Sequence, residues 1–386
     1  MRWLKGRGGR APALLAAAAV CAALAGPARG GVPPGTATDS TPEAAEAWPV
    51  AAVGSDGHQA PYTPLAHAAR PWRLCALLPG TQDKFWWGVS WGLAHEAERL
   101  GVTIGIYQAG GYDRLDVQKA QLQACRGLKA DAYILSAIST DGLDGDIAAI
   151  ADHHQPLVDL INGVGSPYVS AHILSNFHEN GRFGAEYILD HRAAWERASG
   201  HPLKVGWLPG PDGVEWANAM EISALAILRR AGVAVVHGGY GPTALTAQMD
   251  LVRALFEREP DLDVVFGNAV AIQAAANFLR SRHNTTTRLV ATYSTGTVID
   301  LIRDGAVDLA ASDSPILQAR VAVDLAVRAL EGKPHGVWNV MAVDRLDRDH
   351  LAGYDLSRVA VPDGDRFQLR PLPPPGQSLA SPRLGS

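Results

Sequence analysis

The feature that most constrains the fold of this 386-residue chain is a regular alternation of short apolar runs with longer amphipathic segments. The run at 74–78 is followed by Trp86, Val89 and Leu93 at helical spacing, and Gly101 ends that helix. Strand–helix–strand units of this kind form parallel sheets with helices on both faces. The predicted strands are 74–78, 102–106, 132–135, 156–161, 168–174, 205–208, 233–236, 264–267, 289–292, 307–311 and 337–343.

The strand run breaks off after residue 174 and restarts near residue 205, which predicts two α/β lobes. The predicted helices cover 86–100, 115–128, 147–150, 216–230, 246–257, 271–281, 298–303 and 315–331. In open parallel sheets, ligands bind beyond the carboxyl ends of the strands. Two lobes that face each other therefore predict a cleft lined by the segments that directly follow strands.

The two ends of the chain have a different composition from its body. Residues 1–25 predict a secretory signal peptide, because basic residues precede an apolar run at 11–25 that is short for a membrane span. An uncleaved anchor is the alternative. Residues 26–70 predict a flexible linker rich in Pro, Ala and Gly, and 371–386 predict a disordered tail.

Charge and cysteine content narrow the class of protein further. The formal net charge is -5, which argues against nucleic acid as a partner. Cys75 and Cys125 remain after signal removal, so a single disulfide is expected in an oxidising compartment, with two buried thiols as the alternative. Two cysteines are too few for a cysteine-based zinc site, and no metal or other cofactor is expected.

Three adjacent aromatic residues, Phe85, Trp86 and Trp87, open the helix after the first strand. Consecutive helical residues diverge by about 100°, so at least one ring points away from the core. This pattern predicts an aromatic wall of the cleft, with Asp83 beside it as a hydrogen-bond acceptor. The alternative is three packed core or surface residues, since Trp86 also continues the apolar stripe through Val89.

Glycine-rich turns follow two further strands. Gly110 and Gly111 permit a tight turn that presents Tyr112, and their spacing does not fit a dinucleotide-binding motif. The turn at 209–213 precedes Trp216 and lacks the Lys-Ser or Lys-Thr pair of a phosphate-binding loop. We therefore expect Tyr112 at the cleft, whereas Trp216 faces either the cleft or the core.

Polar and aromatic residues also follow the later strands, at Asn268, Tyr293 and Asp313. Asn268 is expected to contact a ligand, although helix capping is an equally common use of Asn and Asp at such positions. The motifs of serine hydrolases and zinc peptidases, GxSxG and HExxH, are absent from the sequence. We therefore expect a binding protein, not an enzyme; a hydrolase is the remaining enzymatic alternative.

Six stretches between Leu74 and Pro334 carry a family resemblance: LCALLPGTQDKFWWGVSWG, QAGGYDRLDVQKAQLQAC, WLPGPDGVEW, FGNAVA, TYSTG and SDSPILQARVAVDLAVRALEGKP. They resemble the type I periplasmic binding proteins of the ribose-binding superfamily and, within it, the TorT-like sensors of trimethylamine N-oxide. The resemblance implies a two-lobed Venus-flytrap fold with interlobe crossovers near Ser175, Ser314 and Trp338. The implied lobes are 71–174 plus 315–338, and 175–314 plus 339–370.

The resemblance also implies a function. Such proteins bind trimethylamine N-oxide in the periplasm and report it to the sensor domain of a membrane histidine kinase. Aromatic faces attract methylated nitrogen, and the ligand-binding residues implied here are Asp83, Phe85, Trp86, Tyr112, Phe177, Trp216, Asn268 and Tyr293. Phe85 stands where the family has tyrosine, and Ser175–Glu179 lacks an expected tryptophan that Phe177 would replace. The alternative is the substrate-binding protein of an ABC importer for a sugar or other small polar solute.

Overall fold

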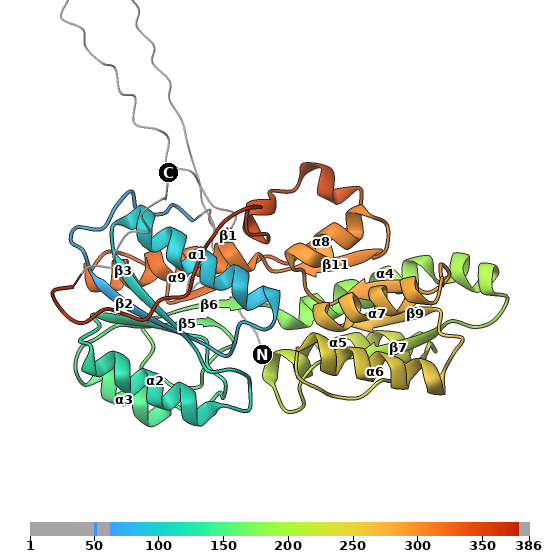
Figure 1. The fold of residues 1–386 in the computed structure, drawn as a ribbon, viewed down its shortest axis with the longest axis horizontal. Helices are drawn as coiled ribbons and strands as arrows, with labels where there is room; N and C mark the ends of the chain where they lie inside the picture. The colour runs from blue at the N-terminus through green and yellow to red at the C-terminus, as the bar shows by residue number, and fades with distance from the viewer. Residues whose placement is uncertain (1–49, 52–61, 378–386) are drawn as a thin grey trace, which may run out of the picture. The chain divides into compact units, whose positions relative to one another are not determined.

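The computed structural model describes residues 50–51 and 62–377 of the chain. The predicted signal peptide, most of the predicted linker and the end of the predicted tail lie outside these residues. Within the described part, no helix is long and apolar enough to cross a membrane. Two sheets with their helices make up this part of the chain (Figure 1).

The first sheet has the strand order β1-β12-β6-β5-β4-β2-β3, parallel except for the antiparallel pair of β1 and β12. Its strands are β1 (Val50–Ala51), β2 (Arg73–Leu78), β3 (Thr103–Gln108), β4 (Ala132–Leu135), β5 (Leu157–Ile161), β6 (Ala171–Ser175) and β12 (Trp338–Met341). Its helices are α1 (Lys84–Leu100), α2 (Leu115–Gly127), α3 (Asp144–Ala151) and α9 (Pro315–Leu330).

The second sheet has the order β13-β11-β10-β9-β7-β8, and its edge strand β13 is antiparallel to β11. Its strands are β7 (Lys204–Leu208), β8 (Ala234–His237), β9 (Val264–Gly267), β10 (Arg288–Ala291), β11 (Leu309–Ser312) and β13 (Asp344–Leu346). Its helices are α4 (Phe177–Ser199), α5 (Glu215–Arg230), α6 (Leu245–Arg258), α7 (Ala269–Ser281) and α8 (Gly296–Arg303). Two 3₁₀ helices follow, η1 (His350–Gly353) and η2 (Leu356–Arg358). The prediction of two α/β lobes is therefore confirmed.

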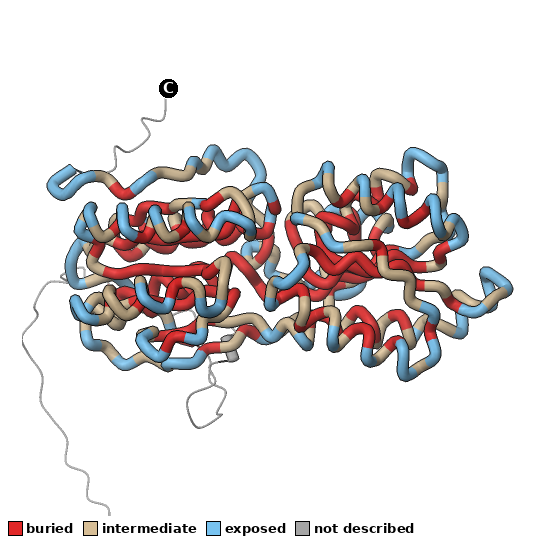
Figure 2. Tube along the Cα trace, turned by 90° about the horizontal axis from the view of Figure 1, so that it is seen from below, coloured by how far each residue is buried: buried red, intermediate tan, exposed pale blue. Residues whose placement is uncertain are grey.

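Strand β2 shows why helices cover both faces of the first sheet. Leu74 and Leu78 pack into the cluster that contains residues of α1, whereas Cys75 and Leu77 pack against α2 and α3 on the opposite face. Successive strand residues point to opposite faces, so a strand that is apolar throughout must be covered twice. The buried strands lie between helices whose outer sides are exposed (Figure 2).

The chain passes between the sheets three times. It leaves the first sheet after Ser175 at the end of β6, returns between β11 and α9 at Ser314, and leaves again after Met341 at the end of β12. The resemblance implied crossovers near Ser175, Ser314 and Trp338. The third falls after Met341 rather than near Trp338, because β12 pairs in parallel with β6 along Trp338–Met341 before the chain crosses.

Helix α4 was not predicted from the sequence, although its 23 residues make it the longest helix of the described chain. Its buried face uses small residues in place of large apolar ones. A Cβ atom at Gly181 would lie 2.2 Å from the Met220 carbonyl oxygen, and one at Gly184 would lie 2.3 Å from the Phe266 ring. The glycines therefore let α4 approach α5 and the sheet closely, and this removes the apolar periodicity that predicts a helix.

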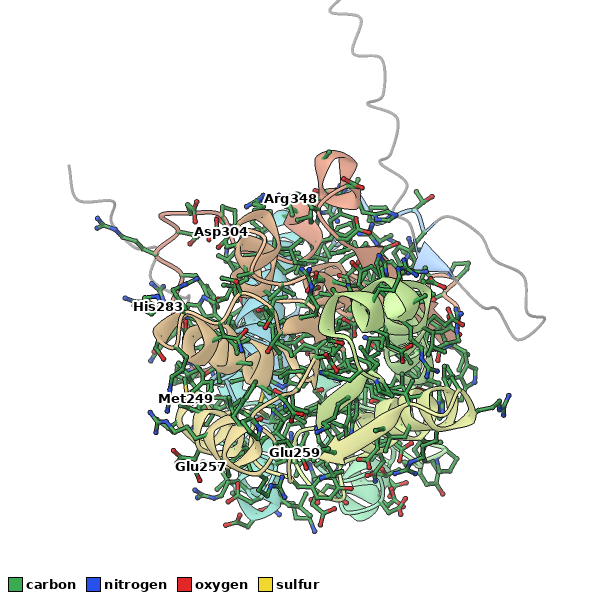
Figure 3. The ribbon with its side chains drawn as sticks, turned by 90° about the vertical axis from the view of Figure 1, so that its right-hand side faces the viewer. Met249, Glu257, Glu259, His283, Asp304 and Arg348 are labelled. Atoms are coloured by element: carbon green, nitrogen blue, oxygen red, sulfur yellow. A yellow bond between two sulfur atoms is a disulfide. The ribbon has the colours of Figure 1, made fainter. Side chains whose placement is uncertain are left out.

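The far end of the second sheet's lobe presents charged side chains to solvent (Figure 3). Glu257 of α6, His283, Asp304 and Arg348 are all exposed there. These residues lie in or beside the segments that precede strands of the second sheet or follow its edge strand β13.

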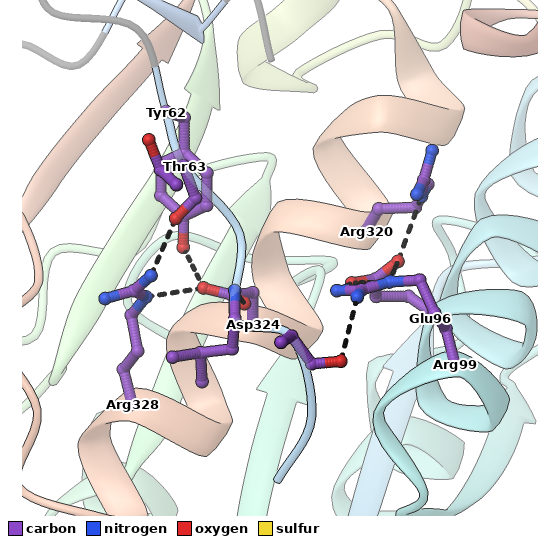
Figure 4. A network of polar contacts seen from close by, with 9 residues as sticks. Tyr62, Thr63, Glu96, Arg99, Arg320, Asp324 and Arg328 are labelled. Atoms are coloured by element: carbon purple, nitrogen blue, oxygen red, sulfur yellow. Dashed lines mark hydrogen bonds and ion pairs between the residues drawn. The ribbon is translucent and has the colours of Figure 1, made fainter. Parts of the chain in front are cut away.

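Parts of the predicted linker and tail are ordered, so those two predictions are wrong for 62–70 and 371–377. The Tyr62 hydroxyl donates to Asp324 Oδ2 at 2.5 Å, and Leu65 N donates to Asp324 Oδ1 at 2.6 Å (Figure 4). In the tail, Leu372 is 2% exposed and packs over Gly105 of β3. Composition did not reveal these segments because each is fixed by a few specific contacts.

Cys75 of β2 and Cys125 of α2 form a disulfide, with their Cα atoms 6.2 Å apart. Both residues are fully buried. The disulfide joins the sheet to α2, and the alternative of two buried thiols does not hold in this structure.

Candidate functional site

A cavity lies where the carboxyl ends of strands from both sheets meet. Six of its lining side chains are aromatic: Phe85, Trp86, Tyr112, Phe177, Trp216 and Tyr293. Four are polar: Asp83, Asn162, Thr243 and Asp313. Ile161 and Met220 complete the lining. The position agrees with the general location of ligands in parallel α/β sheets.

The start of α1 provides one wall. Asp83 is the N-cap, and its Oδ1 accepts from Phe85 N at 2.9 Å, which fixes the first turn. Phe85 and Trp86 are buried and meet edge to face, with ring centroids 5.3 Å apart. Trp87 turns away and packs against Phe367 at 5.2 Å. Of the three adjacent aromatic residues, two therefore line the cavity and one lies outside it.

A hydrogen bond crosses the cavity between the two lobes. The Tyr293 hydroxyl, beyond β10, donates to Asp83 Oδ2 at 2.6 Å. Burial raises the pKa of the Asp83 carboxyl to about 6, against the lowering effect of hydrogen bonds from Tyr293 and Phe85 N. Phe85 also contacts the Tyr293 ring, with centroids 5.4 Å apart. Trp86 and Tyr293 thus lie on opposite lobes and line the same cavity.

Two glycine-dependent turns bring in Tyr112 and Trp216. Gly110 has φ +104°, a conformation open to glycine, in the turn that precedes Tyr112. Gly210 has φ +123°, and a Cβ atom there would lie 2.6 Å from the Trp216 ring. The Trp216 ring contacts those of Tyr293 and Tyr112, with centroids 5.8 and 6.2 Å apart. Trp216 therefore faces the cavity, one of the two orientations, cleft or core, that its sequence left open.

Asp313 was weighed as a possible helix cap, but the structure places it in the cavity lining. It is 1% exposed and follows β11, and the N-cap of α9 is Ser314. Its Oδ2 accepts from the Ser175 hydroxyl, and its Oδ1 has no hydrogen-bond partner within the described chain. Burial raises the pKa of this carboxyl.

Asn162 was missed by the sequence analysis. It follows the last residue of β5 directly, and the strand-end rule that selected the other residues applies to it equally. Its Nδ2 donates to the Ala137 carbonyl at 2.8 Å, and its Oδ1 has no partner among the described residues.

Asn268 does not line the cavity. Its side chain caps α7 by accepting from Ala271 N at 2.9 Å, and its Nδ2 donates to the Leu208 carbonyl at 3.1 Å. Its fully buried amide is thus occupied by the fold, as the capping alternative predicted. Phe177 does line the cavity, from the first residue of α4. The cavity residues remain predicted ligand contacts.

The cavity is small and opens toward a larger one. The space open to water is about 30 Å³ in the inner cavity, roughly the room of two water molecules. The outer cavity offers about 600 Å³ and shares Asp83, Trp86, Tyr112 and Thr243 with the inner one. The inner cavity suits a small ligand, and a bulky one such as a pyranose would need the lobes to separate.

The lining has one more chemical property. Neither the inner nor the outer cavity is lined by a lysine, arginine or histidine of the described residues. No group of three or more His, Cys, Asp or Glu side chains in the described ranges has the arrangement of a metal site. The inner cavity thus combines aromatic faces with two carboxylates and no side-chain cation.

Comparison with known proteins gives a consistent result. A family model for the periplasmic binding protein domain matches residues 75–334. The periplasmic protein TorT of Escherichia coli K12 is 32% identical over 273 residues, which cover 70% of this chain and 76% of TorT.

Solved structures show the same architecture. An ABC transporter solute binding protein from Bradyrhizobium sp. BTAi1, with bound bis-tris, is 34% identical and aligns with a TM-score of 0.68 over 82% of this chain and 94% of that protein. The complex of the TorS sensor domain with TorT in the presence of TMAO aligns at 22% identity with a TM-score of 0.68, over 77% of this chain and 99% of that one. The second likeness supports the fold.

Proposed function

This chain belongs to the periplasmic binding protein family, whose members bind solutes and are not enzymes, and from that premise we propose a specific role. The chain is exported by residues 1–25 and binds a small methylated amine, trimethylamine N-oxide or a relative, in the inner cavity. It reports occupancy to the periplasmic sensor domain of a membrane histidine kinase.

The observation that carries this proposal is the aromatic lining of the inner cavity. Trp86, Tyr112, Trp216 and Tyr293 converge from both lobes on a space without side-chain cations. Methyl groups on nitrogen carry partial positive charge, and aromatic faces attract them by about 0.5 to 2 kcal/mol each, depending on desolvation. The Trp216 indole N–H, which has no partner within the described chain, is a donor for an oxygen on such a ligand.

The partner is proposed from the relatives. Escherichia coli TorT is 32% identical to this chain, and a TorT protein that is 21% identical to it has been crystallised with the TorS sensor domain. Closure of two lobes around a ligand changes the surface that a partner contacts, and this is how binding proteins of this shape transmit occupancy. Affinity of a cognate kinase sensor domain that does not change on ligand saturation would argue against the sensor role.

The second candidate is a solute-binding protein of an ABC importer. The 34% identical Bradyrhizobium protein carries that name and aligns over nearly its whole length. Its bound bis-tris is itself an amine, so an importer for amines fits the same cavity. Neighbouring genes separate the two roles, since a histidine kinase gene supports sensing whereas permease and ATPase genes support import.

The binding proposal is tested by calorimetric titration of methylated amines and sugars into the wild type and two variants. Trp86→Ala should weaken methylamine binding at least about tenfold, because roughly 1.4 kcal/mol corresponds to one decade. Trp87→Ala is the matched control, since that ring packs on Phe367 outside the cavity. Unchanged affinity in a folded Trp86→Ala protein, or binding of sugars in place of amines, would contradict the proposal.

A further inference from the structure

Two buried acceptor atoms in the lining of the inner cavity lack hydrogen-bond partners among the described residues. They are Oδ1 of Asp313, a residue 1% exposed, and Oδ1 of Asn162, a residue 8% exposed. Leaving a buried polar group unpaired is destabilising, and more so for a charged one. Both residues line the inner cavity, so a donor on a ligand bound there would satisfy these two atoms.

The orientation of both side chains is fixed by other contacts. Asp313 Oδ2 accepts from Ser175, and Gln318 Nε2 holds the same corner by donating to the Asp313 carbonyl at 2.8 Å and to Ser175 Oγ at 2.9 Å. Asn162 cannot exchange its oxygen and nitrogen, because Nδ2 already donates to the Ala137 carbonyl. Neither acceptor atom can thus be satisfied by a simple rotation of its own side chain.

The backbone beside each acceptor is strained as well. Ile161, next to Asn162, has φ +70°, and Ser314, next to Asp313, has φ +55°. A left-handed conformation is unfavourable for any residue with a Cβ atom and most of all for a β-branched one. Strain of this kind persists where a binding site requires the geometry.

The charge of the cavity lining indicates which charge a donor on the ligand should carry. Asp83 and Asp313 are the carboxylates of the inner cavity, and no basic side chain of the described residues lines it. A buried carboxylate without a cation is far less stable than one that is paired. A positively charged donor satisfies both the unpaired oxygen and the uncompensated charge.

We infer that the inner cavity selects a protonated methylated amine with at least one N–H, and that Asp313 is the specificity-determining residue that accepts this N–H. The inference rests on the proposed function and narrows its ligand class. An amine oxide carries no net charge and no donor, so it occupies the aromatic walls but leaves Asp313 Oδ1 and Asn162 Oδ1 unpaired. A quaternary ammonium supplies the charge without the donor.

Three ligands of nearly equal size separate these contributions. Trimethylammonium at pH 7 has the charge and one N–H, tetramethylammonium has the charge alone, and trimethylamine N-oxide has neither a net charge nor a donor. Calorimetric titration of the wild type should rank trimethylammonium about tenfold or more above each of the other two, since a hydrogen bond to a charged group is worth about a decade or more in affinity.

A variant pair tests the assigned residue. Asp313→Asn keeps an acceptor oxygen for Ser175 but places an amide donor where Oδ1 lies, so it should remove the preference for trimethylammonium and strengthen binding of the amine oxide. Asp212→Asn is the control, because it removes the same charge from an exposed residue of the outer cavity. It should change the affinity for trimethylammonium less than about twofold, since water and salt screen an exposed charge.

The outcomes separate this inference from the proposed function. The predicted ranking in the wild type, lost in Asp313→Asn, supports the inference. Binding of trimethylamine N-oxide as tight as or tighter than trimethylammonium overturns it and leaves the proposed function standing. Absence of binding by all three ligands overturns both. If Asp313→Asn does not fold, the ranking in the wild type decides.

Discussion

Two regions of the molecule bury carboxylates in opposite ways. Beneath the segment that starts at Tyr62, Asp324 of α9 is fully buried and accepts from Tyr62, Leu65 N and Arg328 Nε. In the cavity, Asp313 is equally buried but has one unpaired oxygen and no cation beside it. The protein itself supplies the hydrogen bonds and the counter-charge of Asp324, whereas it does not supply all of those that Asp313 needs.

The same contrast holds for the second carboxylate of each region. Glu96 of α1 is fully buried and pairs with Arg99 and Arg320 (Figure 4). Asp83 in the cavity receives only neutral donors, Tyr293 and Phe85 N. Burial alone therefore does not identify a binding site. The informative property is whether the fold itself supplies the counter-charge.

The largest effect is expected from breaking the complete network. Asp324→Asn replaces one acceptor oxygen by a donor that faces Tyr62 or Arg328, so the free energy of unfolding should fall by about 3 to 5 kcal/mol. Ligand affinity of the folded protein should stay unchanged, because Asp324 does not line the cavity. Urea unfolding and titration of the same sample measure both. An Asp324→Asn protein with unchanged stability and weakened ligand binding would show that Asp324 serves binding and not stability, against the contrast drawn between the two regions.

A smaller change in the free energy of unfolding, of the opposite sign, is expected when the charge of a cavity carboxylate is removed. The folded-state pKa of Asp83 is raised from 3.8 to about 6, so the folded protein binds more protons than the unfolded chain between these values. Its ionised carboxyl therefore lowers stability as pH rises through this window, on the order of 3 kcal/mol when complete. Below about pH 4 the penalty is absent.

Asp83→Asn removes that penalty and keeps an N-capping side chain. The free energy of unfolding of the ligand-free variant should exceed that of the wild type by about 1 to 3 kcal/mol at pH 8, and the gain should vanish at pH 4. Chemical unfolding at the two pH values gives this comparison. A gain at pH 4 equal to that at pH 8 would show that ionisation of Asp83 is not the cause.

The sequence was informative where one strong local pattern decides the structure. Buried strands such as β2 and β10 contain short apolar runs, and the strand-end rule led from them to Trp86 and Tyr293 in one cavity. Helix α4 was missed because its packing face uses Gly181 and Gly184, whose role depends on the distance to a neighbouring helix. No local pattern reports such a distance.

The polar residues show a second limit of sequence reasoning. Asn268 and Asp313 both follow strands, and the sequence gives each the same two uses, capping or ligand contact. The structure distinguishes the two residues. The Asn268 amide is hydrogen-bonded to Ala271 N and to the Leu208 carbonyl, whereas Asp313 Oδ1 has no hydrogen-bond partner among the described residues. That difference depends on which groups from distant segments, here Ser175 and Gln318, reach the side chain.

Proton release on ligand binding tests most directly whether a positively charged ligand pairs with the buried carboxylates of the cavity. Burial raises the pKa of Asp83 to about 6, Tyr293 and Tyr112 are the titratable groups that interact with it, and Asp313 lines the same cavity. A cation lowers the pKa of a neighbouring carboxyl. Titration of trimethylammonium at pH 6, in buffers of different ionisation enthalpy, should show release of roughly half a proton per ligand. Binding without proton release, or with proton uptake, would contradict the claim.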